Sequence, residues 1–128
     1  MSKTIIGIHL LEKKMISVIV VPETEDFEFN VSHENVIWIN ENLGNPQLVK
    51  RNTNYCIPFW IKEGYANRIF HIIDFKFNKK ERYIKLGNSF LLPTIWKKIG
   101  QNRRFEYHNL KDFGLTEITP GIVIPLNQ

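Results

Sequence analysis

The stretch that most constrains the fold runs from Tyr55 to Pro93, YCIPFWIKEGYANRIFHIIDFKFNKKERYIKLGNSFLLP. Its strongest strand signal is Arg68–Phe77, in which Ile69, His71, Ile73, Phe75 and Phe77 fall on one face and Phe70, Ile72, Asp74 and Lys76 on the other. Turn-type residues at Lys62–Gly64 and Asn78–Lys80 separate this run from its neighbours. The pattern predicts three consecutive strands, Cys56–Ile61, Arg68–Phe77 and Arg82–Leu92, the last broken at Gly87-Asn88. Pro58 favours an edge or a bulge for the first of them, because proline cannot donate to a ladder.

Shorter β-type segments lie on both sides of this block. An N-terminal hairpin is predicted over residues 1–21, in which Met15–Val21 is buried on both faces. Helix signals are fewer. Ser32 can cap a short helix over Glu34–Leu43 that Gly44 closes in the left-handed region. The remaining predicted elements are strands at Phe27–Val31, Arg103–Asn109 and Ile122–Leu126 and one helical turn within Pro93–Ile99.

These elements predict one mainly β (α+β) domain spanning residues 1–128. About seven or eight short strands at near-regular spacing, with one or two short helices, favour a small barrel or a strongly bent sheet. The length is that of a single domain with its own core.

The cysteine count and the hydropathy pattern exclude several classes. Cys56 is the only cysteine, which excludes an internal disulfide and a multi-cysteine zinc site, and a small buried hydrophobe is its expected role. No apolar run reaches the roughly 18 residues of a membrane span, and the N-terminus lacks a signal-peptide pattern. The expectation is a cytoplasmic protein with no membrane association, no cofactor and no metal.

Charge is distributed unevenly along the chain. Residues 1–46 carry three lysines against seven acidic residues, whereas residues 47–128 carry fourteen Lys and Arg against six acidic residues. The net charge of the whole chain is +4, but its C-terminal part is much more basic than this total indicates. Such asymmetry favours a polyanion as the partner of one face.

No enzyme signature accounts for the sequence. Glu63 followed by Asp74-Phe75-Lys76 could hold Mg²⁺ in a metal-dependent nuclease, the weaker of the functional hypotheses. The four histidines are scattered singly, and only His108 has polar and basic neighbours in the sequence. There is no glycine-rich phosphate loop. We expect a protein without catalysis.

Basic residues alternate with aromatic ones at several points in the C-terminal part. Examples are Trp60-Ile61-Lys62, Arg82-Tyr83-Ile84-Lys85, Trp96-Lys97-Lys98 and Arg103-Arg104-Phe105. Lysine and arginine neutralise phosphates, and an exposed tryptophan or tyrosine offers a stacking face to an unpaired base. Most aromatics must build the core, so we expect only one or two of Trp38, Trp60, Trp96 and Tyr107 to be exposed.

A family resemblance extends over about residues 27–118. Phe29-Asn30-Val31-Ser32-His33-Glu34-Asn35 followed by Trp38 resembles the strand-into-helix opening of the EVE domains, members of the PUA-like superfamily. Ile57-Pro58-Phe59-Trp60 resembles the aromatic strand of that family, and Arg103-Arg104-Phe105-Glu106-Tyr107 its late strand. The hairpin 1–21 would be an addition to this PUA-like core.

The resemblance implies a pseudo-barrel with a cleft for a modified or flipped base, or for structured RNA. Its helix start, aromatic strand and basic late strand would face one pocket, in which a base stacks and arginines hold phosphates. Together with the basic–aromatic pattern, this gives the predicted nucleic-acid-binding residues: Ser32, Asn35, Trp38, Trp60, Lys85, Arg103, Arg104 and Tyr107.

The function predicted first is a non-catalytic module that binds DNA or RNA in a basic aromatic cleft. The alternative is a small protein-interaction or inhibitor protein, for example phage-encoded, acting on a host complex through its acidic N-terminal third. The metal-dependent nuclease is the third hypothesis.

Overall fold

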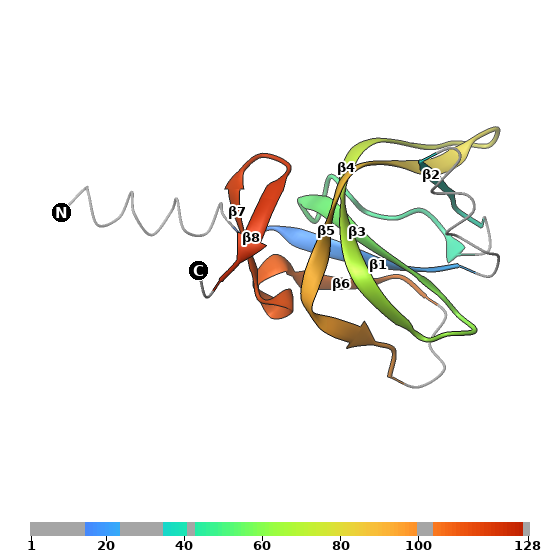
Figure 1. The fold of residues 1–128 in the computed structure, drawn as a ribbon. Coiled ribbons are helices and arrows are strands. Elements are labelled where there is room, and N and C mark those ends of the chain that lie inside the picture. Colours follow the sequence, from blue (N-terminus) through green and yellow to red (C-terminus); the bar gives the residue numbers. More distant parts are fainter. Residues whose placement is uncertain (1–14, 24–34, 41–42, 100–103, 127–128) are drawn as a thin grey trace.

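The computed structural model describes residues 15–23, 35–40, 43–99 and 104–126, which are mainly β (Figure 1). These residues contain eight strands and one short 3₁₀ helix, and no α-helix. The elements are β1 (Ser17–Glu23), β2 (Val36–Trp38), β3 (Thr53–Trp60), β4 (Tyr65–Phe77), β5 (Arg82–Lys97), β6 (Glu106–Asn109), η2 (Leu110–Phe113), β7 (Leu115–Thr119) and β8 (Ile122–Pro125). The predicted strand Phe27–Val31 lies outside the described residues.

Six strands form one mixed sheet in the order β2-β5-β4-β3-β1-β6, and β7 and β8 form a separate two-stranded sheet. β1 runs parallel to β3, whereas the other paired strands are antiparallel. Figure 1 shows β4 and β5 as one long bent hairpin that crosses the molecule. The six-stranded sheet ends at β2 and β6 and is therefore not a closed barrel.

β1 lies inside the sheet and is buried on both faces, as the sequence predicts. Its residues from Ser17 to Pro22 are buried, because β3 pairs with Ser17–Glu23 on one side and β6 with Ser17–Val20 on the other. The other half of the predicted hairpin, Thr4–Leu11, lies outside the described residues. Since both hydrogen-bonding edges of Ser17–Val20 are occupied, β1 is paired with distant strands over this stretch and not within a local hairpin.

The helix predicted over Glu34–Leu43 is wrong, because its centre is β2. Val36, Ile37 and Trp38 pair antiparallel with Lys85, Ile84 and Tyr83 of β5. Ile37 and Ile39 are buried while Trp38 and Asn40 are exposed, which is the alternation of a strand. β-Branched residues at 36, 37 and 39 fit this pleated surface better than a helix. Gly44 does have the predicted left-handed conformation, with a φ of +77°, but it lies in a loop and does not cap a helix.

The helical turn predicted within Pro93–Ile99 is also wrong, because β5 continues to Lys97. Ala66 pairs with Trp96 and Tyr65 with Lys97 at the start of β4. The ladder is irregular between Ala66 and Arg68, where β5 has several extra residues around Pro93. Proline cannot donate to a ladder, and here it lies within this bulge.

Pro58 lies on an interior strand, but where β3 has a neighbour on one side only. The β3–β4 ladder joins Tyr55 to His71 and Cys56 to Phe70 and goes no further, whereas β1 pairs with β3 up to Trp60. The missing N–H of Pro58 therefore interrupts no β3–β4 ladder bond. The prediction of an edge-like position for this proline is confirmed in this local sense.

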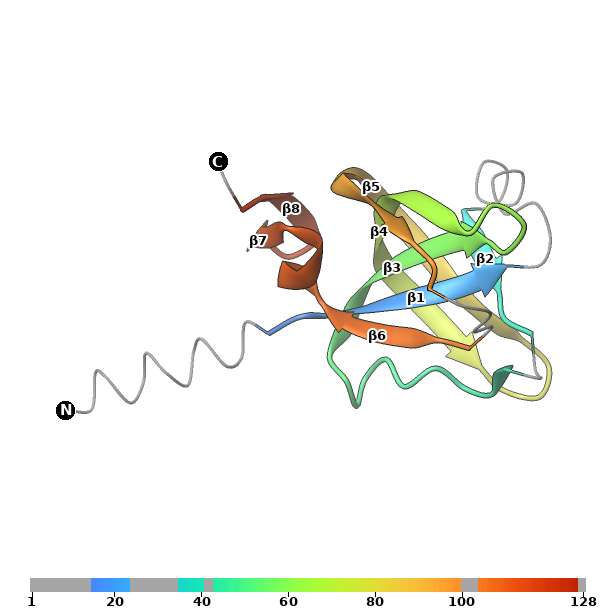
Figure 2. The same ribbon diagram turned by 90° about the horizontal axis from the view of Figure 1, so that it is seen from below.

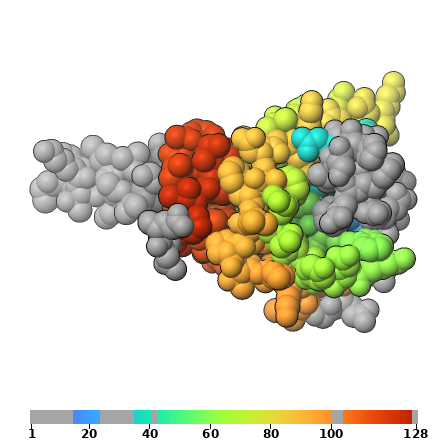
Figure 3. Space-filling model, viewed as in Figure 1, coloured from blue at the N-terminus to red at the C-terminus, as the bar shows by residue number. Residues whose placement is uncertain are grey.

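The sheet separates two apolar clusters. Cluster 1 contains Ile16, Val18, Val20, Tyr55, Ile57, Phe59, Ala66, Ile69, Leu92, Leu110, Leu115 and Val123. Cluster 2 contains Ile19, Val21, Ile37, Ile39, Leu48, Cys56, Phe70, Ile72, Ile84 and Leu86. Alternate residues of β1 and β3 enter different clusters, so these two strands supply both cores. The β7–β8 hairpin covers part of cluster 1 and lies beside β5 (Figure 3).

The loop at Gly44–Gln47 bonds to β5 on one side of the open sheet and to the edge strand β6 on the other. Arg82 of β5 donates to the backbone oxygen of Gly44 and to the side-chain oxygen of Asn45. The backbone N–H of Gln47 donates to the Tyr107 hydroxyl of β6 at 2.9 Å. Figure 2 shows this loop running alongside β6 towards the start of β3. The loop thus takes the place that a ladder would have in a closed barrel.

Gly87 is the point at which β5 changes the cluster that it faces. Ile84 and Leu86 belong to cluster 2, whereas Phe90 and Leu92 pack on cluster 1. Between them Leu86 pairs with Ile72 and Ser89 with Phe70, so β5 has an extra residue in a bulge. The break predicted at Gly87-Asn88 is this bulge.

Substitution Gly87→Ala is expected to destabilise the fold, because a Cβ at this position would lie 2.6 Å from Ile73 Cγ2. Overpacking of this kind costs about 1–2 kcal/mol, near the low end of its usual range because Ile73 is half exposed. Urea denaturation of Gly87→Ala measures the loss. In an Ile73→Ala background the clash is absent, and an undiminished loss there would contradict this explanation.

Candidate functional site

The structure distributes the predicted nucleic-acid-binding residues over three separate places. Ser32 and Arg103 lie outside the described residues. Of the rest, Asn35, Trp38 and Lys85 lie at the β2–β5 edge of the sheet, Trp60 at the end of β3, and Arg104 and Tyr107 at β6. The six described residues do not converge on one pocket.

The β2–β5 group is held by backbone and ring contacts. Asn35 has a φ of 58°, and both its backbone oxygen and its side-chain amide bond to the backbone of Leu86. Asn35 is therefore a structural residue at the start of β2. Trp38 is 51% exposed, with its ring 5.6 Å from that of Tyr83. Lys85 is exposed opposite Val36.

Trp60 is half-buried at the end of β3. The Lys62 ammonium lies over the Trp60 ring, 5.4 Å from the ring centroid, and makes a cation–π contact with it. The indole N–H is buried and has no hydrogen-bond partner among the described residues. Neither of the two concave surfaces near β6 includes Trp60.

One side of the Tyr107 ring packs against the core, and the side chain also lines a surface hollow. Its ring packs on cluster 2, as does that of Phe105, so the predicted inward direction of both is confirmed. The Arg51 guanidinium lies 4.3 Å from the centroid of the Tyr107 ring. Arg104, just before β6, is exposed.

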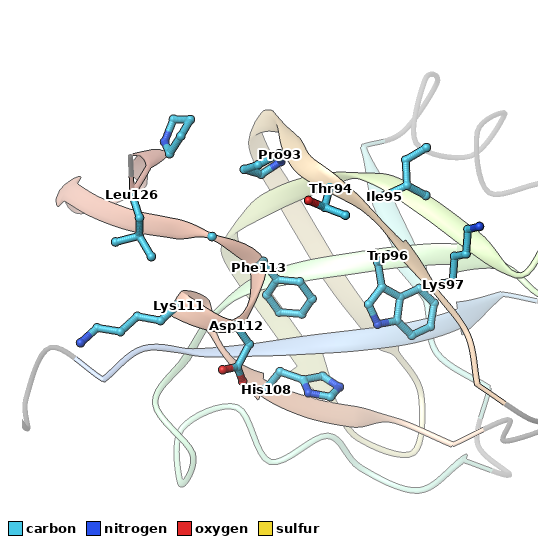
Figure 4. A pocket seen from close by; sticks show the side chains of 12 residues that line it. Pro93, Thr94, Ile95, Trp96, Lys97, His108, Lys111, Asp112, Phe113 and Leu126 are labelled. Atoms are coloured by element: carbon cyan, nitrogen blue, oxygen red, sulfur yellow. The ribbon is translucent and has the colours of Figure 1, made fainter. Parts of the chain in front are cut away.

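A cleft of about 650 Å³, here called the Trp96 cleft, lies between the end of β5 and the β6–η2 segment (Figure 4). Its walls are Pro93, Thr94, Ile95, Trp96, Lys97, His108, Lys111, Asp112, Phe113, Gly114, Pro125 and Leu126. Figure 4 shows Trp96, His108 and Phe113 around the same space, with Lys97 and Lys111 towards its two ends. Three aromatic rings thus meet in one concavity, and Lys97 and Lys111 lie at its rim with their ammonium groups directed away from the rings.

The aromatic walls of the Trp96 cleft are fixed by the core. Trp96 packs at 4.8 Å on Phe59, which is fully buried in cluster 1. Phe113 also packs on cluster 1, and the ring of His108 meets it edge-on at 5.7 Å. A rigid, half-exposed aromatic wall loses little conformational entropy when a flat ligand binds against it.

Polar groups in this cleft are only partly satisfied. His108 Nε2 lies 3.4 Å from Glu106 Oε1, but without the geometry of a hydrogen bond, and the atom is buried with no partner in the described chain. Asp112 Oδ2 accepts from the backbone N–H of Asn109 at 3.1 Å and so caps η2. The His108 Nε2 atom therefore lies buried beside the Glu106 carboxylate and is not exposed to the cleft, and Asp112 is engaged in the turn.

A smaller hollow of about 300 Å³ adjoins the Trp96 cleft, and His108 and Asp112 line both. Its other walls are Ser17, Arg51, Tyr107 and Asn109. We call it the Arg51 hollow. It adds a guanidinium and a further aromatic ring to the concave surface, and it is where the predicted residue Tyr107 enters the site.

The residues of the nuclease hypothesis are not brought together. Glu63 lies in the turn before β4 and Asp74 near the end of β4, about 30 Å apart along the strand. Lys76 pairs with Glu81 at 3.7 Å. In the described part of the chain no three His, Cys, Asp or Glu side chains are grouped as a metal site requires. Cys56 is fully buried, and burial raises the pKa of its thiol.

Sequence reasoning placed Trp96, His108 and the lysines near them outside the predicted site. Trp96-Lys97-Lys98 did stand out as a basic–aromatic motif, but the expected helical turn separated it from the strands. Arg51 lies in none of the predicted elements. The sequence signal that could have indicated this site is the proximity of His108 to basic residues. In the structure His108 lies on β6 and lines the cleft.

Comparison with known proteins gives no relative for this chain. No protein-family model, no curated protein and no solved structure matches it. Among the residues that the structure describes, no helix has the length and apolar character needed to cross a membrane.

Proposed function

We propose that this chain is a non-catalytic nucleic-acid-binding module that takes an unpaired base into the Trp96 cleft. The single observation behind the proposal is the meeting of three aromatic rings in one concavity whose rim carries Lys97 and Lys111. Its volume of about 650 Å³ is within the roughly 300–1,000 Å³ typical of small-ligand sites.

The expected roles of the residues follow from their chemistry. The half-buried ring of Trp96 provides a stacking face, a contact that contributes about 1–3 kcal/mol per base. Lys97, Lys111 and, in the adjoining hollow, Arg51 neutralise phosphates.

The PUA-like assignment is part of the same proposal. What supports it is an open six-stranded sheet in which the loop at Gly44–Gln47 links β5 to the edge strand β6. A cytoplasmic location also remains a proposal. The protein-interaction hypothesis places its contact surface within residues 1–46, much of which lies outside the described residues.

The test is the binding of a fluorescent single-stranded oligonucleotide of about three nucleotides, measured by anisotropy at low salt. Trp96→Leu keeps an apolar contact for Phe59 but removes the stacking face, so affinity should fall roughly 5- to 100-fold. Lys111→Glu should weaken binding and reduce the log–log salt slope by about 1. Lys80→Glu, at the tip of the β4–β5 hairpin, is the matched control and should bind like the parent.

Two results would overturn the proposal. One is the absence of any salt-dependent binding by the parent protein. The other is a Lys111→Glu variant that binds as tightly as the Lys80→Glu control.

A further inference from the structure

A second aromatic and basic surface lies on the outer face of β2, β5 and β4, away from the Trp96 cleft. Trp38, Tyr83 and Lys76 face one another across the three strands, and Val36, Lys85 and Asp74 form the next row. We call these six residues the Trp38 face. None of them lines the Trp96 cleft or the Arg51 hollow.

The aromatic residues of the Trp38 face are held in place while remaining accessible. Buried neighbours on the opposite side of these strands, Ile37 and Ile84, belong to cluster 2. Trp38 and Tyr83 are therefore excluded from that core by strand alternation, and their rings meet at an interplanar angle of 68°. An exposed tryptophan braced by a tyrosine offers a rigid stacking surface.

Charge on and around this face favours a polyanion. Lys76 and Lys85 lie on the Trp38 face against Asp74, and the adjoining turn adds Lys79 and Lys80 against Glu81, four basic residues against two acidic ones. The Lys76–Glu81 pair is about half exposed on both sides, and such a pair is weak enough to open for a phosphate. Lys85 is exposed beside the aromatic pair.

We infer that the Trp38 face is a second contact for the same ligand, and that this ligand is a single-stranded segment. The inference rests on the proposed function. In a duplex the base faces are stacked on one another, so neither Trp38 nor Trp96 could stack on them without unpairing. Both surfaces lie on β5, where Lys85 and Pro93 are about 26 Å apart along the strand.

This separation makes the inference testable by ligand length. An oligonucleotide of about twelve nucleotides exceeds 26 Å even at the roughly 3.4 Å per nucleotide of a stacked strand, whereas one of about three does not. Trp38→Ala should weaken binding of the longer strand by at least fivefold, the effect of losing one stack. The same variant should bind the shorter strand like the parent, and Trp38→Phe should retain most of the affinity for the longer strand.

The controls separate the two proposals. Trp96→Leu should weaken both ligands, and near-ultraviolet circular dichroism should show that Trp38→Ala keeps the parent's fold. If the longer strand binds Trp38→Ala as it binds the parent while Trp96→Leu weakens it, this inference fails and the proposed function stands. If the parent binds neither strand, the proposed function fails.

Further outcomes count against the inference. Equal loss of affinity for both lengths would place Trp38 in the cleft site rather than in a separate contact. Equal affinity for a duplex of the same length would show that exposed base faces are not what the protein reads. An acidic protein partner that the Trp38→Ala variant no longer binds, together with unchanged oligonucleotide binding, would assign the face to protein recognition.

Discussion

Replacing Gly121 by alanine is expected to destabilise the protein by about 2–4 kcal/mol, and to loosen the β7–β8 hairpin first. Gly121 lies between β7 and β8 with a φ of +87°, which an L-residue adopts only at a cost. A Cβ there would also lie 2.8 Å from His71 Nδ1 and 2.9 Å from His71 Cε1. The His71 ring is itself held by Tyr55 at 5.4 Å, so it cannot easily move away.

Gly44→Ala is the matched control for this experiment. Gly44 has a similar φ of +77°, but a Cβ added to it would have no other atom within 4 Å. It should therefore show the backbone cost alone, about 1–2 kcal/mol. Urea denaturation gives both values, and hydrogen exchange locates the loss. Equal destabilisation by the two substitutions would show that contact with His71 contributes nothing.

Strands with strict alternation and clear turns could be predicted from the sequence. Arg68–Phe77 and Arg82–Leu92 lie within β4 and β5, and the turn at Asn78–Lys80 connects them. The burial of β1 on both faces also followed from its Ile- and Val-rich composition. In each case the signal is local, because the face periodicity of β4 and the continuous apolar run of β1 each appear within a single stretch of residues.

The two wrong helix predictions share one physical cause. Ser32 and Gly44 do have the residue types of helix caps, but the β-branched residues Val36 and Ile37 between them pair with β5. Their partners are Lys85 and Ile84, which lie 49 and 47 residues further along the chain. Trp96 is likewise held in a strand by Ala66 and Phe59. Pairing with distant strands overrides local signals, and a sequence does not state which strands will meet.

The sequence predicted the residue types of the candidate site, basic and aromatic, but not which segments come together to form it. Alternation of basic and aromatic residues marked the Trp96-Lys97 and Arg82–Lys85 segments as candidates. Which of them share a concavity depends on the path of β5 past β6 and η2, and on the bulge at Gly87 that turns β5 from one cluster to the other. Arg51 reaches the site only because the loop before β3 lies along β6.

The hydroxyl of Tyr55 is expected to make the stability of the protein fall as pH rises above about 10. This ring is fully buried, and its hydroxyl donates to Glu117 Oε2 at 2.5 Å, an oxygen that also accepts from the Gly121 N–H at 3.2 Å. Burial, and next the Glu117 carboxylate, raise the pKa of Tyr55 well above its ordinary value. Since the raised pKa belongs to the folded state, the contribution is complete below pH 10 and declines above it, where only the unfolded chain loses the proton readily.

Comparing the parent with Tyr55→Phe tests this expectation. Near pH 8 the variant should be less stable by about 1–3 kcal/mol, because the half-buried Glu117 loses one of its two donors. This difference should shrink progressively as the pH is raised above 10, whereas Tyr65→Phe, at an exposed tyrosine, should follow the parent throughout. A Tyr55→Phe difference that stays constant up to pH 11 would mean that the hydroxyl does not hold its proton in the folded protein. Because Glu117 and Gly121 both belong to the β7–β8 hairpin, the decline would also identify this bond as part of what joins that hairpin to cluster 1.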